Sequence, residues 1–166
     1  MDPSGSFNEG KGTSGYSIWA YNNMQYKLLN VGQLSALEYE TQQDYWQAHI
    51  NLLRDIKPDI LVIEDYLLYA HKAMQQTGSK METPKLIGII QYECSKLNIQ
   101  VELQKAVDVK NRWTDDILVY KGILIREGNH YNTEQKKKIS RHIRDSIRHG
   151  IHYIMKVRNK EWKKKQ

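Results

Sequence analysis

Four positions of this 166-residue sequence stand out as candidate ligands of a hard metal ion. Asp2 opens a segment rich in Gly and Ser, and Glu64 directly follows an unbroken apolar run. His142 and Asp145 lie three residues apart, so a helix would present them on one side. A few carboxylates that leave positions open for water and phosphate suit Mg²⁺ or Mn²⁺. Two such ions about 4 Å apart can activate a water and stabilise the departing oxygen of a phosphodiester.

Each of these residues also has a purely structural interpretation. The start Asp-Pro-Ser-Gly is compatible with a simple turn, and Glu64 with the first exposed residue of a loop. His142 and Asp145 can form a solvated helix face. His149 and His152 extend the same series along the helix, but histidines without cysteines at a fixed spacing are weak evidence for zinc. Both interpretations stay open at this point.

The elements that position these residues are those of an α/β fold. Residues 60–63 (Ile-Leu-Val-Ile) are typical of a parallel strand that is buried on both faces. Ligand sites in open α/β sheets lie beyond the carboxyl ends of the strands, so Glu64 stands where a site is expected. Further strands are predicted over 16–21 and 26–31, which turn at Asn22-Asn23, and over 99–103. The order of strands and helices predicts a mixed sheet.

Four helices complete the predicted order. One covers residues 38–56, and a second opens with Thr83 as its N-cap and Pro84 at its first position. Thr114 caps a short third helix. The last helix is predicted from about residue 132 or 133 to about residue 158. At the other end of the chain, residues 4–15 are rich in Gly and Ser and are predicted to form a loop.

The last helix has three faces. Its apolar stripe is Ile139, Ile143, Ile147, Ile151 and Ile154, its basic stripe is Lys137, Arg141, Arg144 and Arg148, and its third stripe is His142, Asp145, His149 and His152. On a helical wheel Asp145 lies far from the centre of the apolar stripe, while Ser146 and Gly150 widen the face that can be buried.

The charge of the chain is concentrated near its C-terminal end. The net charge is +6, with 40% hydrophobic and 27% charged residues. From residue 136 onward the cationic residues are Lys136, Lys137, Lys138, Arg141, Arg144, Arg148, Lys156, Arg158, Lys160, Lys163, Lys164 and Lys165. Such a segment indicates a polyanionic partner such as nucleic acid, or else a solvated basic face with a frayed tail.

Targeting signals are not expected in this sequence. No window approaches the roughly 20 apolar residues of a membrane span, and the first residues have neither a basic start nor an apolar run. The single cysteine, Cys94, excludes an internal disulfide and weakly favours a reducing compartment. We therefore expect a cytoplasmic protein with no membrane partner.

Three short motifs, in order along the chain, resemble those of the RuvC-like Holliday junction resolvases. Residues 2–4 (Asp-Pro-Ser) with 13–16 (Thr-Ser-Gly-Tyr) resemble the opening motif, and residues 60–66 (Ile-Leu-Val-Ile-Glu-Asp-Tyr) resemble the second. Residues 142–146 with Gly150 resemble the last motif, in which small residues let the helix pack closely on the sheet. Residues 108–110 resemble the family's Val-Lys segment, and the extended Gly-Lys-Gly-Thr loop is similar to the phage-encoded branch.

The resemblance implies an RNase H-like mixed sheet flanked by helices and a nuclease of recombination and repair. It implies that Asp2, Glu64 and Asp145 bind Mg²⁺ or Mn²⁺, with two ions in each site, and that His142 is a fourth ligand or a general acid or base. Lys110 would contact the scissile phosphate or stabilise its transition-state charge. The partner would be branched DNA, and a homodimer would bind it. The protein would act in the cytoplasm, which is that of a bacterial host if the gene is phage-encoded.

Residues expected to contact the DNA come from three regions of the chain. Tyr66 or Tyr69 would stack on an unpaired base near the branch point, although Tyr69 also suits a core or a dimer interface. The full set expected to bind nucleic acid is Tyr66, Tyr69, Lys110, Arg112, Lys137, Arg141, Arg144 and Arg148. We expect residues 1–158 to form the nuclease domain and residues 159–166 to form a basic tail.

The sequence departs from the family pattern at its start. Only Met1 precedes Asp2, so the first strand of the RNase H-like sheet is predicted to be largely missing, and Asp2 to be weakly held. The last motif rests mainly on the resemblance, because the helical wheel does not require Asp145 to face a site. Two other functions stay open: another RNase H-like nuclease, such as one that cuts RNA–DNA hybrids, and a catalytically inactive module that binds nucleic acid or protein.

Overall fold

The computed structural model describes residues 1–7, 12–67 and 81–164, which alternate between strands and helices. The chain divides into two compact units. The first unit comprises Met1–Asp2, Gly15–Gln33 and Ala106–Gln166, and the second comprises Pro3–Ser14 and Leu34–Lys105. Each unit is therefore built from segments that are distant in sequence. The presence of both helices and strands confirms the predicted α/β class.

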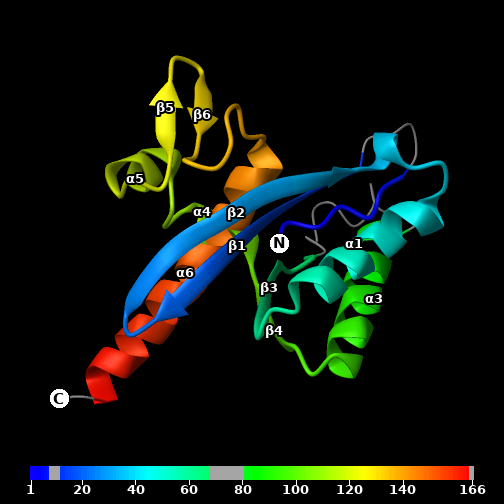
Figure 1. The fold of residues 1–166 in the computed structure, drawn as a ribbon, viewed down its shortest axis with the longest axis horizontal. Helices are drawn as coiled ribbons and strands as arrows, with labels where there is room; N and C mark the ends of the chain where they lie inside the picture. Colours follow the sequence, from blue (N-terminus) through cyan, green and yellow to red (C-terminus); the bar gives the residue numbers. More distant parts are fainter. Residues whose placement is uncertain (8–11, 68–80, 165–166) are drawn as a thin grey trace. The chain divides into compact units, whose positions relative to one another are not determined.

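A long hairpin supplies the strands β1 (Thr13–Asn22) and β2 (Gln25–Ser35) (Figure 1). Its turn lies at Asn23 and Met24, which have positive φ angles of 49° and 65°. Two consecutive left-handed residues are typical of the tight turns that join two strands. The sequence predicted this hairpin with shorter strands, and with a turn one residue too early.

The first unit continues with α4 (Ala106–Lys110), α5 (Asp115–Tyr120), β5 (Ile125–Glu127) and β6 (His130–Asn132). The predicted cap of the short helix is confirmed, because the Thr114 hydroxyl oxygen accepts a hydrogen bond from Ile117 N–H at 3.4 Å. Strands β5 and β6 form a small antiparallel hairpin that turns at Gly128, whose φ is 57°. This hairpin was not predicted from the sequence.

The last helix, α6, runs from Arg141 to Lys164, so its predicted bounds were wrong at both ends. Asn132 ends β6, and its side-chain oxygen accepts a hydrogen bond from Lys138 N–H at 2.7 Å. Lys138 has a positive φ of 49°, which interrupts any helix through this segment. At the other end, helical structure includes most of the segment that was expected to be a tail.

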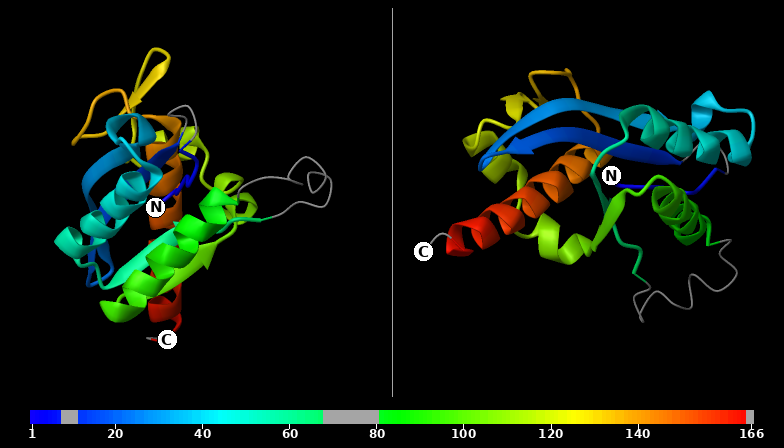
Figure 2. Two further views of the ribbon diagram at one scale, coloured as in Figure 1. Left: turned by 90° about the vertical axis from the view of Figure 1, so that its right-hand side faces the viewer. Right: turned by 60° about the horizontal axis from the view of Figure 1, so that its bottom comes forward.

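The apolar stripe of the last helix forms the core of the first unit, as predicted. Ile143, Ile147 and Ile151 are at most 1% exposed and pack with Leu28 and Val31 of β2. Figure 2 shows α6 lying against the β1–β2 hairpin. Two glycines allow this close approach, since a Cβ on Gly15 would meet His142 O at 2.1 Å and one on Gly150 would meet Trp19 Nε1 at 2.3 Å.

The second unit contains two parallel strands, β3 (Ile60–Glu64) and β4 (Gln100–Gln104), with the helices α1 (Gln42–Ile56) and α3 (Glu82–Lys96) and the short 3-10 helix η2 (Ala36–Glu38). Ile60 is opposite Gln100 and Glu64 is opposite Gln104. Both strands lie within one residue of their predicted bounds, and β3 is a parallel strand as predicted. Only Leu61 and Ile63 of β3 are buried, so the expected burial on both faces was wrong. The helices α1 and α3 contact each other, and α3 contacts β4.

The ends of these helices show where local sequence rules held and where they failed. Helix α1 begins after Thr41, whose hydroxyl accepts from Asp44 N–H at 3.1 Å, and it ends at Lys57 with a φ of 45°. Helix α3 begins after Met81, not at the predicted cap Thr83. The Thr83 hydroxyl instead accepts a hydrogen bond from Gly5 N–H at 3.0 Å, because a contact 78 residues away in sequence competes for it.

The single mixed sheet stays a prediction. Within the described ranges the strands pair as three separate two-stranded sheets, β1–β2, β3–β4 and β5–β6. Where the first strand of an RNase H-like sheet was expected, Asp2 forms an isolated antiparallel bridge with Gly15. No helix among the described residues is both long and apolar enough to cross a lipid bilayer.

Candidate functional site

Asp2 is held more firmly than the sequence suggested. Its N–H donates to Gly15 O at 2.9 Å, and Gly15 N–H donates back to Asp2 O at 3.0 Å. The residue is 9% exposed, and Met1 before it is also buried. One bridge to β1 is therefore enough to fix Asp2, although the first strand was expected to be largely missing.

Asp145 is a buried carboxylate surrounded by cations, not part of a solvated helix face. It is 3% exposed. Its Oδ1 pairs with the Arg148 guanidinium from the next turn of α6. Its Oδ2 lies 3.2 Å from Lys110 Nζ and 3.7 Å from Arg141 Nε. Three positive charges thus offset the cost of burying this one negative charge.

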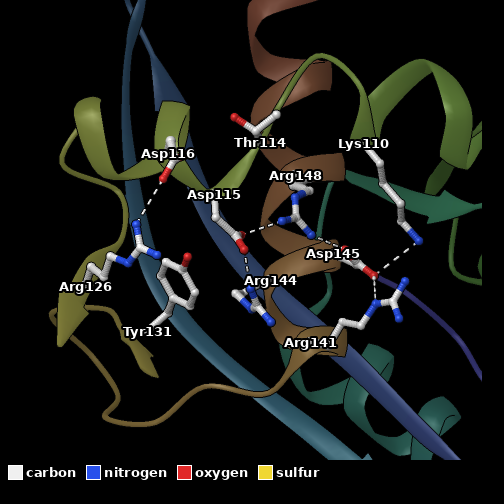
Figure 3. Close-up of a pocket in the computed structure, with 10 residues that line it drawn as sticks. All are labelled: Lys110, Thr114, Asp115, Asp116, Arg126, Tyr131, Arg141, Arg144, Asp145 and Arg148. Carbon is white, nitrogen blue, oxygen red and sulfur yellow. Dashed lines mark hydrogen bonds and ion pairs between the residues drawn. The ribbon is translucent and has the colours of Figure 1, made fainter. Parts of the chain in front are cut away.

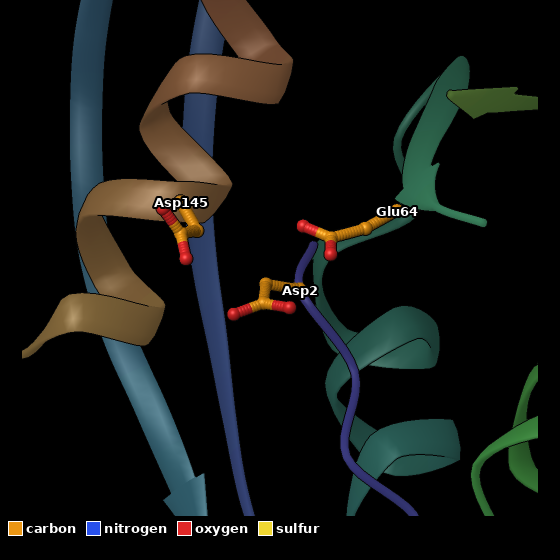
Figure 4. A group of neighbouring side chains, drawn as sticks. All are labelled: Asp2, Glu64 and Asp145. Carbon is orange, nitrogen blue, oxygen red and sulfur yellow. The ribbon is translucent and has the colours of Figure 1, made fainter. Parts of the chain in front are cut away.

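The carboxylates of Asp2 and Asp145 come together within the first unit. One oxygen of each offers a ligand position within 4.8 Å of the other. Figure 4 draws these two side chains, from the start of the chain and from α6. The helical wheel left the orientation of Asp145 undecided. The close packing at Gly15 decides it, because it brings the first turn of α6 against β1, the strand with which Asp2 pairs.

His142 is bound to Asp2. Its Nδ1 lies 2.8 Å from Asp2 Oδ2, and because a carboxylate accepts, the ring nitrogen donates. This hydrogen bond raises the pKa of His142 above its ordinary value, with the negative charges of Asp2 and Asp145 adding to the effect, whereas partial burial and Arg141 oppose it. In this geometry Nδ1 is engaged, so Nε2 is the nitrogen that remains for a metal or a proton.

Glu64 belongs to the second unit, where it is the last residue of β3 and is partly buried. It lies opposite Gln104 at the carboxyl end of two parallel strands, as its position in the sequence predicted. Figure 4 includes its side chain, which extends from the end of the strand.

The basic residues expected to bind DNA fall into two groups. Lys137, Arg112 and Arg141 are exposed, with 77% of the Arg141 side chain accessible. Arg144 and Arg148 are instead tied to Asp115, and Arg148 Nε also donates to Trp113 O at 2.7 Å. Asp115 lies in the first turn of α5, where a negative charge already suits the positive end of the helix, so nothing local in the sequence indicated that it also holds two arginines of α6.

The aromatic residues expected near a branch point are only partly placed. Tyr66 is partly buried in the second unit, two residues beyond Glu64. Tyr69 lies outside the described residues. A different tyrosine, Tyr131 of β6, has the guanidinium groups of Arg126 and Arg144 over its ring, at 5.7 and 4.7 Å from the ring centre. The sequence signal that could have located Tyr131 is the turn at Gly128-Asn129, which is typical of the hairpin that carries it.

Comparisons with known proteins support the fold. No protein-family model and no curated protein sequence matches the chain. Among solved structures, T. thermophilus RuvC in complex with a Holliday junction substrate is similar with a TM-score of 0.66 and 13% identity, over 95% of this chain and 92% of that one. A second structure of Thermus thermophilus RuvC gives a TM-score of 0.58 and 14% identity, over 89% and 87% of the two chains. The chain therefore has a RuvC-like fold.

Proposed function

We propose that this chain is a metal-dependent endonuclease that resolves Holliday junctions and related branched DNA. The observation that carries the proposal is the pair of carboxylates Asp2 and Asp145, close together and largely buried on a RuvC-like fold. Two carboxylates this close repel each other, and paired hard oxygen atoms are the ligands that Mg²⁺ and Mn²⁺ bind. One similar RuvC structure holds a Holliday junction substrate, which supports the same class of DNA here.

Glu64 is the third carboxylate of the proposed site. Its position at the carboxyl end of β3 supports this assignment, since ligands of open α/β sheets bind beyond that edge. His142 is assigned first to holding Asp2 through Nδ1, and Nε2 is the atom through which it would act as a ligand or as an acid or base.

The donor set suits two divalent ions. When bound, such a pair supplies an activated water and stabilises the oxygen that leaves the phosphodiester. Lys110 and Arg141 contact Oδ2 of Asp145, and their side chains are 30% and 77% exposed. If a metal were held through Asp145, Lys110 and Arg141 would stand beside it, where their charges could contact the scissile phosphate and offset its developing charge.

The proposed enzyme works as a homodimer of the phage-type branch that nicks two strands symmetrically. The residues of the loop that suggested this branch are partly outside the described ranges, so the branch rests on sequence resemblance. Light scattering of the protein during size-exclusion chromatography tests the dimer. Twice the chain mass of 19.6 kDa supports it, and a single chain mass with and without a junction contradicts it.

A second candidate function is a catalytically inactive module that binds nucleic acid. The observation that favours it is that both oxygens of Asp145 are already paired with cations. Calorimetric titration with Mn²⁺ separates the two functions. A nuclease site binds Mn²⁺ and loses this binding in Asp2→Asn, while an inactive module binds a junction but no Mn²⁺.

The substrate class is tested with a panel of labelled nucleic acids in Mg²⁺. The panel contains a four-way junction, a linear duplex of the same sequence and an RNA–DNA hybrid. We expect paired nicks in the junction and none in the duplex. Preferred cleavage of the hybrid assigns the chain to another class of RNase H-like nuclease, and no cleavage of any substrate overturns the proposal.

A further inference from the structure

A cavity of about 480 Å³ opens beside Asp145 in the first unit (Figure 3). Its walls come from α5, the β5–β6 hairpin, the end of α4 and the first turns of α6. Five cationic side chains line it, Lys110, Arg126, Arg141, Arg144 and Arg148. Three carboxylates line it as well, so its formal charge is +2 and the ligand it favours is an anion.

Two of these arginines are fixed before any ligand binds. Asp115 accepts from both Arg144 and Arg148, whose side chains are 21% and 11% exposed. Each guanidinium has five N–H donors, and these ion pairs leave some of them available. A preformed donor set loses little conformational entropy on binding, which favours an anion with several oxygens, such as a phosphate.

Arg126 is the adjustable cation of the cavity. It extends from β5, its side chain is 57% exposed, and it lies 3.3 Å from Asp116, whose side chain is 82% exposed. An ion pair this exposed contributes little, so Arg126 can exchange it for a better partner at small cost. Its guanidinium also lies over the ring of Tyr131, which lines the same cavity.

Asp145 joins this cavity to the proposed metal site. The same carboxylate lines the cavity and lies within 4.8 Å of Asp2. A metal held by Asp2 and Asp145 would contact the scissile phosphate. An anion bound in the cavity would therefore lie next to that phosphate. In a DNA strand, the neighbour of one phosphate is the next phosphate of the backbone.

We propose that this cavity binds a backbone phosphate of the cleaved strand, adjacent to the scissile phosphate, with Arg126 of the β5–β6 hairpin as its movable contact. This inference rests on the proposed function and deepens it. Guanidinium groups bind phosphate oxygens in a fork, and such contacts set the position of a strand without reading its sequence. The hairpin thereby becomes an element that positions the strand in the site.

The test is a binding cycle with single methylphosphonates, which remove the charge of one phosphate. Affinity for a four-way junction is measured in Ca²⁺ or EDTA with the neutral group placed at successive positions around the nick site. We expect one position adjacent to the scissile phosphate to weaken binding by wild type, and to weaken binding by Arg126→Ala clearly less, because Arg144 and Arg148 remain in the cavity. We also expect Arg126→Ala to lower the slope of log affinity against log salt by about 1.

Two variants serve as controls. Arg158→Ala removes the same charge from an exposed position of α6 outside the cavity, and it should keep the full methylphosphonate effect. Arg126→Lys keeps the charge and should recover most of the affinity. Additive effects at every position, or equal coupling in Arg158→Ala, overturn the inference even if the protein nicks junctions. Coupling in a protein that binds but never nicks supports the phosphate site and refutes the nuclease, and no DNA binding at all overturns both.

Discussion

Arg148 donates to Oδ1 of Asp145 from the next turn of α6, while Asp115 and the carbonyl of Trp113 hold the same guanidinium. The candidate carboxylate is thus part of a buried network that links α5 to α6. Arg148 is fixed by three partners, so Oδ1 is committed to it. Oδ2 is the less tightly held oxygen, because its partners Lys110 and Arg141 are farther away and more exposed, so it is the better candidate to contact the proposed metal.

Replacing Arg148 should therefore destabilise the fold. Arg148→Met leaves Asp145 and Asp115 with fewer buried partners, and we expect the free energy of unfolding to fall by about 3 kcal/mol. Lys110, Arg141 and Arg144 still offset the charges of the two carboxylates. The expected loss of unfolding free energy is therefore at the low end of the range for removal of one partner from a buried ion pair. Urea unfolding measures it. Arg158→Met, at an exposed position of the same helix, should stay within about 0.5 kcal/mol of wild type, and equal effects of the two substitutions would contradict the network.

Gly15 should be essential to the approach of α6. A Cβ there would meet the backbone of His142 and Ile143 at 2.1 to 2.6 Å, so Gly15→Ala must move the strand or the helix. We expect a loss of about 2 kcal/mol or more in the free energy of unfolding and weaker Mn²⁺ binding, because Gly15 also pairs with Asp2.

The matched substitution for this prediction is Gly88→Ala. Gly88 lies within α3, and a Cβ there meets nothing within 4 Å. Alanine in a helix interior is favoured over glycine, so this change should add about 0.5 to 1 kcal/mol. A Gly15→Ala protein as stable as wild type, with unchanged Mn²⁺ affinity, would show that the contact does not position Asp2.

Stability should fall in mild acid because of His49. This fully buried ring donates from Nδ1 to Tyr45 O at 2.8 Å and accepts the Ser14 hydroxyl at Nε2 at 2.8 Å in its neutral form. Burial lowers its pKa to about 4, partly opposed by the hydrogen bond to Tyr45. The unfolded chain, with a pKa near 6.5, binds a proton first, so the contribution is intact above about pH 6.5 and is lost as the pH falls towards 4.

The expected loss from His49 is about 3 kcal/mol between pH 7 and pH 4. Urea unfolding at several pH values measures it, with His49→Gln as the comparison. The glutamine variant is less stable at pH 7, yet it lacks this ionisation and should show a smaller fall with acid. Parallel pH profiles for the two proteins would mean that His49 does not take up a proton on unfolding.

Local patterns predicted the positions of several site residues. Glu64 followed a recognisable buried strand, Thr114 capped α5, and the isoleucine spacing predicted the buried face of α6. These features depend on neighbouring residues or on a helical repeat, which a sequence displays directly. The RuvC-like fold followed from three short motifs in order and is confirmed by the structural likeness, not by any sequence match.

The parts that sequence reasoning missed depend on contacts between distant residues. Helix α6 begins at Arg141 because β6 uses Asn132 to bind Lys138, and no local rule distinguishes this from a helix cap. The orientation of Asp145 follows from packing against Gly15, 130 residues earlier. Asp115 suits the positive end of α5 and is also the partner of two arginines, so its local role concealed its tertiary one.

The proposed carboxylate site is tested most directly by the rate at which wild type, Glu64→Gln and Asp55→Asn nick a labelled four-way junction in Mg²⁺. Asp55 is an exposed carboxylate in the same unit as Glu64. We predict paired nicks by wild type and by Asp55→Asn, and a loss of at least about a hundredfold in rate for Glu64→Gln, of the order seen when a charge-stabilising group is removed. Absence of nicks in wild type, or undiminished nicking by Glu64→Gln, would contradict the proposed carboxylate site.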